Sequence, residues 1–77
     1  MNNLVILIGV LLSINDSYLE IKVDNLGIIK VFIDETIDNK NLFIDKLTKI
    51  EGRLKYYNFP FPVVVAEKIY QIKNDIS

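Results

Sequence analysis

The sequence predicts an all-β domain of five strands, with one short helix between the third and the fourth strand. Three observations support this prediction. Apolar and β-branched residues alternate with polar ones along most of the chain. Clusters of Asn, Asp, Gly and Pro separate these runs, as expected for turns, and one acidic segment without alternation interrupts them. Because the chain has 77 residues, we expect a single domain over 1–77, with 73–77 as a frayed tail.

The first predicted strand covers 3–13 and consists almost entirely of leucine and β-branched residues. Such a run is typical of a strand that is buried on both faces. Gly9 in its middle indicates a bulge or a tight bend. The apolar run covers only 4–12, whereas a membrane-spanning helix needs about 20 residues. No positive charge precedes it, as one would in a signal peptide, so we expect a buried strand and no membrane association.

A β-hairpin is predicted next, after the turn cluster "SINDS" at 13–17. In "YLEIKVD" at 18–24 apolar and polar side chains alternate, so Leu19, Ile21 and Val23 point to one face. "NLG" at 25–27 supplies the glycine that a tight turn needs. "IIKVFI" at 28–33 is the third strand.

The segment 34–47 changes in character, because the β-branched run stops there. Phe43 and Leu47 are four residues apart, which is the spacing of one helix face. Asp38 or Asn39 would cap the helix. We therefore predict one to two helical turns over 39–47.

Acidic residues crowd the front of that segment: Asp34, Glu35 and Asp38. Carboxylates are ligands for hard cations, but this spacing lacks the glycine and the closing glutamate of a calcium loop. The same residues would lie near the positive end of the predicted helix dipole. We interpret them as the start of a helix and expect no metal site.

The last two predicted strands form a second hairpin. Alternation returns in "TKIEGRLKYY" at 48–57, and "VVVAEKIYQI" at 63–72 is a second β-branched run. "NFPFP" at 58–62 is the turn between them, because proline fixes φ and cannot donate to a strand ladder. We expect Tyr56 and Phe61 to face inward and close one end of the core.

The order of these elements is strand, hairpin, short helix, hairpin. It is the order of the five-stranded OB-fold barrel, which is the predicted fold. An SH3-like barrel and an open α+β sheet are the rival interpretations, although an SH3-like barrel would not place a helix between the third and fourth strands.

The composition excludes several kinds of site. The chain has neither cysteine nor histidine, so it has no disulfide framework, no thiolate metal site and no histidine base. Its serines therefore lack a histidine partner for nucleophilic catalysis. We expect a cytoplasmic protein that is not an enzyme and needs no cofactor. The net charge of -1 is unusual for a nucleic-acid binder, because phosphate contacts normally require a clearly basic surface.

Two stretches carry a resemblance to a known family: "NNLVILIGVLLS" at 2–13 and "IEGRLKYYNFPFPVVVAEKIYQI" at 50–72. The first resembles the opening strand of bacterial single-stranded DNA-binding proteins. The second resembles their closing hairpin, in which a Glu-Gly-Arg-Leu-like strand leads through an aromatic-containing loop to a Val-rich strand. The middle of the chain matches only in the order of its elements.

The resemblance implies a groove in which aromatic side chains stack on bases and basic side chains follow the phosphates. Carried over by position, Phe59 and Phe32 fall near the family's stacking positions, and Tyr57 lies close to Phe59 in the sequence. Basic residues of the strands would line the backbone path. The candidate nucleic-acid-binding residues are Lys22, Lys30, Phe32, Arg53, Lys55, Tyr57 and Phe59.

Several features depart from the family pattern. The chain has no tryptophan, the loop between the last two strands is short, and three acidic residues share the outward faces with the basic ones: Glu20, Asp24 and Glu51. A primosomal replication protein of the same fold is an equally close comparison. The basic residues are also explained as solvated strand charges, and Phe32 as a subunit contact.

The predicted function is single-stranded DNA binding in replication or repair, by a homo-oligomer (a dimer or a tetramer) that associates through its first strand. Two alternatives stay open. The domain could be a protein interaction module or an accessory replication subunit with little DNA binding, which the net charge favours. It could also bind RNA or a peptide in the same groove.

Overall fold

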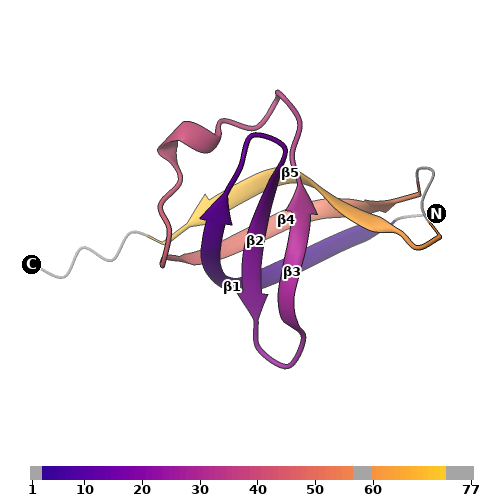
Figure 1. Cartoon of the computed structure of the whole chain (residues 1–77), viewed down its shortest axis with the longest axis horizontal. Coiled ribbons are helices and arrows are strands. Elements are labelled where there is room, and N and C mark those ends of the chain that lie inside the picture. Colours follow the sequence, from indigo (N-terminus) through magenta and orange to yellow (C-terminus); the bar gives the residue numbers. More distant parts are fainter. Residues whose placement is uncertain (1–2, 57–59, 73–77) are drawn as a thin grey trace, which may run out of the picture.

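The computed structural model describes residues 3–56 and 60–72. It contains five strands and one 3-10 turn (Figure 1): β1 (Leu4–Ile14), β2 (Tyr18–Val23), β3 (Gly27–Phe32), η1 (Asn39–Asn41), β4 (Leu47–Lys55) and β5 (Val63–Gln71). The five predicted strands are confirmed, with bounds that agree to within two residues.

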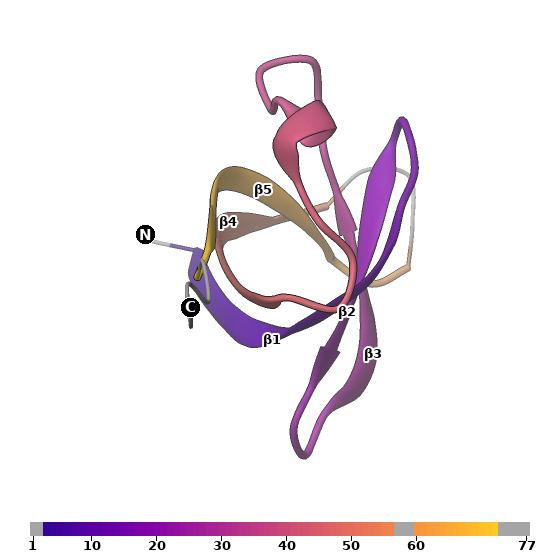
Figure 2. The ribbon, with the colours of Figure 1, turned by 90° about the vertical axis from the view of Figure 1, so that its left-hand side faces the viewer.

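The strands form one mixed sheet that closes on itself into a ring. The order around the ring is β1-β2-β3-β5-β4, and β4 pairs again with β1. All neighbours are antiparallel except β3 and β5, which run parallel and pair at only two positions, Val31 with Val64 and Phe32 with Val65. Strand β1 pairs with β4 through residues 4–10 and with β2 through residues 10–14, so one long strand serves both sides of the ring (Figure 2).

The core fills the inside of this ring. Its fully buried apolar members come from all of the first four strands and include Leu11, Leu19, Ile21, Val31 and Ile50. The alternation predicted for 18–24 is therefore confirmed at Leu19 and Ile21. Thr48 is the buried polar side chain among the described residues, and its hydroxyl donates to the Lys46 carbonyl oxygen at 2.8 Å. A hydrogen bond of this kind removes the cost of burying the hydroxyl.

Two glycines allow strands to come unusually close. A Cβ at Gly9 would lie 2.0 Å from the carbonyl oxygen of Lys22, and one at Gly52 would lie 2.3 Å from that of Val65. Gly9 sits where β1 passes from β4 to β2, whereas the β1 bulge lies after Leu11. The bulge interpretation of Gly9 is thus wrong, and close approach is the reason for a glycine there. At the 25–27 turn Gly27 has φ of 87°, as predicted for a tight turn.

The predicted helix over 39–47 is wrong beyond its first turn. Asp38 does cap η1 by accepting a hydrogen bond from the Lys40 amide at 3.0 Å. The chain then leaves the helical conformation, and Asp45 has φ of 69°. The Gln71 side chain binds both the amide and the carbonyl of Phe43, at 2.8 and 2.7 Å. These bonds take the place of helical hydrogen bonds at Phe43.

No helix in residues 3–56 or 60–72 is long and apolar enough to cross a membrane.

Two burial predictions are also wrong. Strand β1 buries only one face, because Leu7 and Leu11 point into the core while Ile6 and Ile8 are 52% and 54% exposed. Tyr56 and Phe61 do not close the core, since they are 70% and 63% exposed. A ring of five strands has one interior, which takes one face of each strand, so the apolar side chains on the other face of β1 stay outside.

Candidate nucleic-acid interface

An aromatic and basic cluster lies on the outer face of the β2–β3 hairpin. Tyr18 and Phe32 are directly opposite each other, and their ring centroids are 6.2 Å apart at 55°. The Lys30 Nζ atom lies 4.3 Å from the centre of the Tyr18 ring, within the range of a cation–π contact. The hairpin turn causes this arrangement, because the pairing of Val23 with Gly27 sets the register of every later pair.

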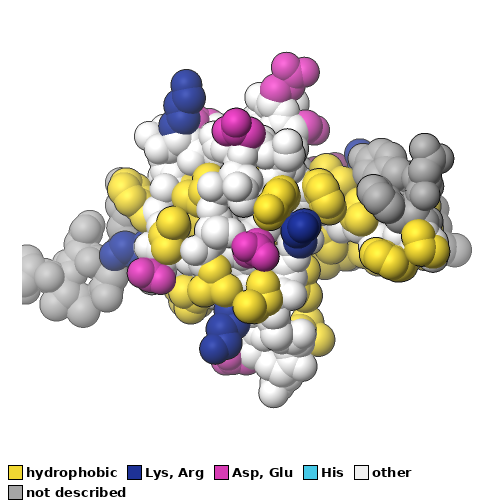
Figure 3. Space-filling view, viewed as in Figure 1, with side chains coloured by type: hydrophobic (Ala, Val, Ile, Leu, Met, Phe, Trp, Pro, Cys, Tyr) yellow, Lys and Arg dark blue, Asp and Glu magenta, His cyan; other side chains and the backbone are white. Residues whose placement is uncertain are grey.

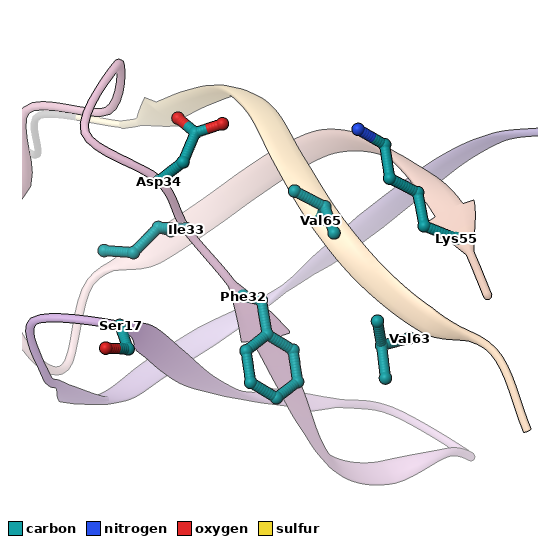
Figure 4. Close-up of a pocket in the computed structure, with 7 residues that line it drawn as sticks. All are labelled: Ser17, Phe32, Ile33, Asp34, Lys55, Val63 and Val65. Carbon is teal, nitrogen blue, oxygen red and sulfur yellow. The ribbon is translucent and has the colours of Figure 1, made fainter. Parts of the chain in front are cut away.

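A groove runs along the line where β3 and β5 diverge. It consists of two cavities of about 290 and 340 Å³ that share Phe32 and Val63. The first cavity is also lined by Ser17, Ile33, Asp34, Lys55 and Val65 (Figure 4). The second is also lined by Ile29, Lys30, Phe61, Pro62 and Val64. We call the two cavities together the β3–β5 groove. It exists because these two strands pair at only two positions.

The groove carries both signs of charge. Lys30 lies at one end and Lys55 at the other, and Asp34 shares the first cavity with Lys55. The Asp34 Oδ1 atom accepts hydrogen bonds from the Thr36 hydroxyl and from the Thr36 amide, the latter at 2.9 Å. These bonds, and to a smaller extent the nearby Lys55 ammonium, hold the pKa of Asp34 below its ordinary value. Asp34 is therefore ionised at neutral pH.

Three of the predicted site residues meet in this groove, namely Lys30, Phe32 and Lys55. Arg53 lies on β4, where its Nε donates to Glu67 Oε2 at 3.0 Å in an exposed ion pair. Lys22 projects from the outer face of β2 opposite Ile28, nearer to the hairpin tip. The other two predicted residues, Tyr57 and Phe59, lie outside the described residues.

Acidic side chains interrupt the basic ones on the same faces. Glu20 pairs directly with Lys30 across the hairpin and accepts a hydrogen bond from the Ser13 hydroxyl at 2.7 Å. On β4, the Glu51 Oε2 atom lies 3.5 Å from the Lys49 Nζ atom. Figure 3 shows apolar, basic and acidic side chains intermixed over the β2–β3 side of the molecule. A strongly basic surface is absent from this view, which agrees with the net charge of -1.

Residues at the groove that are not among the sequence-predicted candidates include Tyr18, which packs beside Phe32, and Asp34, which lines the first cavity. The alternation of 18–24 puts Tyr18 on the face opposite Leu19, and counting back from the turn at 25–27 pairs it with Phe32. Asp34 was interpreted as part of a helix start. The Asp-x-Thr spacing of residues 34–36, typical of a side-chain turn, was the signal that it binds Thr36 instead.

A second surface of different character lies on β1. Its outward positions are all apolar and are between 37% and 54% exposed: Leu4, Ile6, Ile8 and Val10. We call this row the β1 stripe. Residues 5–9 of β1 pair with β4 but not with β2, so the stripe borders a strand edge. A contiguous exposed apolar row is a candidate interaction surface.

Comparison with known proteins does not identify a family for this chain. No protein-family model matches the chain, and no curated protein matches it. Within residues 3–56 and 60–72, no group of three or more acidic side chains is arranged to hold a metal ion. A functional proposal has to rest on the geometry of the groove and of the β1 stripe.

Proposed function

We propose that the closed ring of strands is an OB-fold barrel and that the protein binds single-stranded DNA in the β3–β5 groove. The strand order and the position of the β3–β4 connection support this fold. OB-folds bind oligonucleotides on the face of their second and third strands, between the first and the last interstrand loops. The β3–β5 groove borders that face, and Ser17 and Phe61 come from those two loops.

The observation that carries the proposal is the cluster of Tyr18, Lys30 and Phe32. Phe32 is half-buried in the groove and rests against Tyr18, so its ring is held in place before a base arrives. A preorganised ring loses little entropy on binding. Stacking of a base on an aromatic side chain contributes about 1–3 kcal/mol. Lys30, at one end of the groove, can contact a phosphate of the same strand, and Lys55 adds positive charge at the other end.

The small number of cations implies weak binding by a single chain. A protein that contacts few phosphates releases few counterions, so its electrostatic gain is limited. We propose that two or four chains associate through the β1 stripe and together present several grooves. Linked sites gain affinity without new contacts. The same stacking chemistry serves RNA. Replication or repair in the cytoplasm is the setting that fits a single-strand binder.

The β1 stripe also favours a second candidate function. An interaction module or accessory replication subunit needs an apolar docking surface more than it needs a basic groove. Glu20 beside Lys30, and Glu67 beside Arg53, would weaken DNA binding in such a protein. This candidate predicts association with another chain and little affinity for nucleic acid.

The deciding experiment is fluorescence anisotropy with a labelled oligo-dT of about 30 nucleotides, a length that covers more than one OB-fold site. Phe32→Ala is the test variant and Phe43→Ala the control, because Phe43 is exposed and lies outside the groove. We expect binding that weakens with salt, a roughly 5- to 150-fold loss in Phe32→Ala, and no loss in Phe43→Ala.

Lys30→Ala should reduce the salt dependence, because one phosphate contact is lost. Equal affinities of the Phe32→Ala and Phe43→Ala proteins would contradict the groove. Failure to bind at tens of micromolar protein in low salt would contradict DNA binding and favour the interaction module.

A further inference from the structure

The first cavity of the β3–β5 groove has a chemistry that plain stacking and phosphate binding do not use. Its floor is apolar, with Val63 and the 7% exposed Val65 beside the Phe32 ring. Figure 4 shows the Asp34 carboxylate and the Lys55 ammonium on opposite sides of Val65. At about 290 Å³ the cavity is just below the ~300–1,000 Å³ typical of small-molecule sites, so it suits a ligand as small as one base.

A carboxylate is an unusual group in a site for a polyanion, because it repels phosphate. Asp34 remains ionised at neutral pH, as its bonds to Thr36 favour the charged form. Both of those bonds use Oδ1. No other described residue donates a hydrogen bond to Oδ2, which leaves this oxygen as an acceptor for a ligand. An ionised carboxylate can only accept hydrogen bonds, so it selects a base edge that carries donors.

The four bases differ in how they meet this pair of charges. Guanine carries two neighbouring donors, N1–H and N2–H₂, on one edge and two acceptors, O6 and N7, toward the other. It can therefore donate to Asp34 while it accepts from Lys55. Adenine and cytosine each offer one amino group. Thymine has a single N3–H that lies between two carbonyl oxygens, which an ionised carboxylate repels.

We propose that the cavity lined by Phe32, Asp34 and Lys55 is a guanine-selective subsite. Guanine lies on the apolar floor beside Phe32, its N1–H and N2–H₂ edge donates to Asp34, and its O6 and N7 side accepts from Lys55. For a DNA strand this inference rests on the proposed function, since the strand delivers the base. A free guanine nucleotide presents the same edges, so the shared chemistry is the guanine base.

The test compares 12-nucleotide dT strands in which one central position is dT, dG, dA, dC or dI. Deoxyinosine lacks the N2 amino group and keeps the rest of the guanine edge. We expect the dG strand to bind about tenfold more tightly than the all-dT strand, with most of the gain lost for dI. A parallel titration with GMP, followed by NMR amide shifts, separates a free nucleotide from a base in a strand.

Asp34→Asn is the informative variant. The asparagine carbonyl oxygen can keep the bond from the Thr36 amide, while an NH₂ group replaces Oδ2 and faces the guanine donors. The ratio of dG to dT affinities should fall to within about twofold. Asp24→Asn, an exposed change at the hairpin tip, is the matched control for charge and should keep the ratio.

Equal affinities for the dG and dT strands, or a preference that survives in Asp34→Asn, would overturn the subsite while leaving DNA binding in place. Binding of GMP that depends on Asp34, without binding of any strand, would support the subsite and contradict the proposed function. No response to either probe would overturn both.

Discussion

The β1 stripe and the β3–β5 groove are outward surfaces of the same ring, yet they are built in opposite ways. The β1 stripe is a flat row of four aliphatic side chains, and the β3–β5 groove is a depression with aromatic rings, two lysines and a carboxylate. Flat apolar rows pack against another protein surface, whereas an aromatic groove with fixed charges holds a small planar group. This difference is the reason that the proposed function assigns separate roles to the two surfaces.

Sheet pairing explains why the two surfaces differ. Over residues 4–10, β1 is flanked by β4 in unbroken register, so its outward side chains form a regular row. Strands β3 and β5 pair at two positions only and then separate. The gap exposes Phe32 and Val63 from the side, and a cavity forms. The amount of pairing between neighbouring strands thus decides whether the ring presents a flat row or a groove.

The largest expected effect is a loss of folding stability, caused by a substitution in the ring of strands that carries both surfaces. In Gly9→Ala the new methyl group would meet the Lys22 carbonyl oxygen, so the strands must move apart. Overpacking of this kind typically costs about 1–3 kcal/mol, and contact with backbone favours the upper end. Gly27→Ala is the control, since it has open space and a cost of about 1–2 kcal/mol from its positive φ alone. Urea unfolding monitored by circular dichroism measures both, and equal losses would contradict close approach at Gly9.

The next largest expected effect is a change in oligomeric state, from a substitution in the β1 stripe that leaves the β3–β5 groove intact. Ile8→Asp places a charge in the centre of the β1 stripe and should dissociate the proposed oligomer, since a buried aliphatic side chain contributes about 1.5–3 kcal/mol. Leu26→Asp, at the exposed hairpin tip, is the matched control. Light scattering after size-exclusion chromatography gives the mass of each. If the wild-type and Ile8→Asp proteins form particles of the same mass in solution, the β1 stripe is not the contact between copies.

A smaller effect is expected from the acidic residue beside the groove. Glu20→Gln keeps an oxygen for the Ser13 hydroxyl but removes the charge opposite Lys30. Oligo-dT affinity at low salt should rise about two- to fivefold, the range of an exposed charge interaction. Asp45→Asn makes the same change in charge outside the groove lining. An equal rise in both variants would show that only net charge matters.

The smallest effect concerns the ionisation of Asp34. Thr36→Val removes the hydroxyl bond, so the pKa of Asp34 should rise toward its ordinary value of 3.8, while Thr36→Ser should keep it low. The pKa of Asp34 is lower in the folded protein than in the unfolded chain. The hydrogen bonds to Thr36 therefore stabilise the fold fully above pH 3.8, and this stabilisation is lost as the pH falls through the folded-state pKa. Carboxyl ¹³C shifts followed against pH report this pKa, and identical titrations in wild type and Thr36→Val would contradict the assigned cause.

Much of the fold was predictable because local signals were strong. The period-two alternation of 18–24 and the turn at 25–27 gave the first hairpin, and the prolines at 60 and 62 stay outside the strands. The helix prediction failed because Gln71, far away in the sequence, binds the backbone of Phe43. The exposure of Ile6 and Ile8 was not predictable either. A continuous apolar run has the same pattern on both faces of the strand, so it does not indicate which face packs against the core.

The groove was predictable only in part. The resemblance to single-stranded DNA-binding proteins implies Lys30, Phe32 and Lys55 as site residues, and the ring brings these three together. The parallel pairing of β3 with β5 joins residues over 30 positions apart, and it depends on how the ring closes. That closure is what places Asp34 opposite Lys55 across Val65, and no local pattern encodes it.

The most direct test is a ¹⁵N–¹H NMR titration of the whole protein with oligo-dT, because it reports which surface the strand touches. We predict that the largest amide shifts lie around the groove, at Ser17, Lys30, Phe32, Val63 and Val65, and that Ile6 and Ile8 change little. Shifts concentrated on β1, or no shifts at tens of micromolar strand, would contradict single-strand binding in the β3–β5 groove.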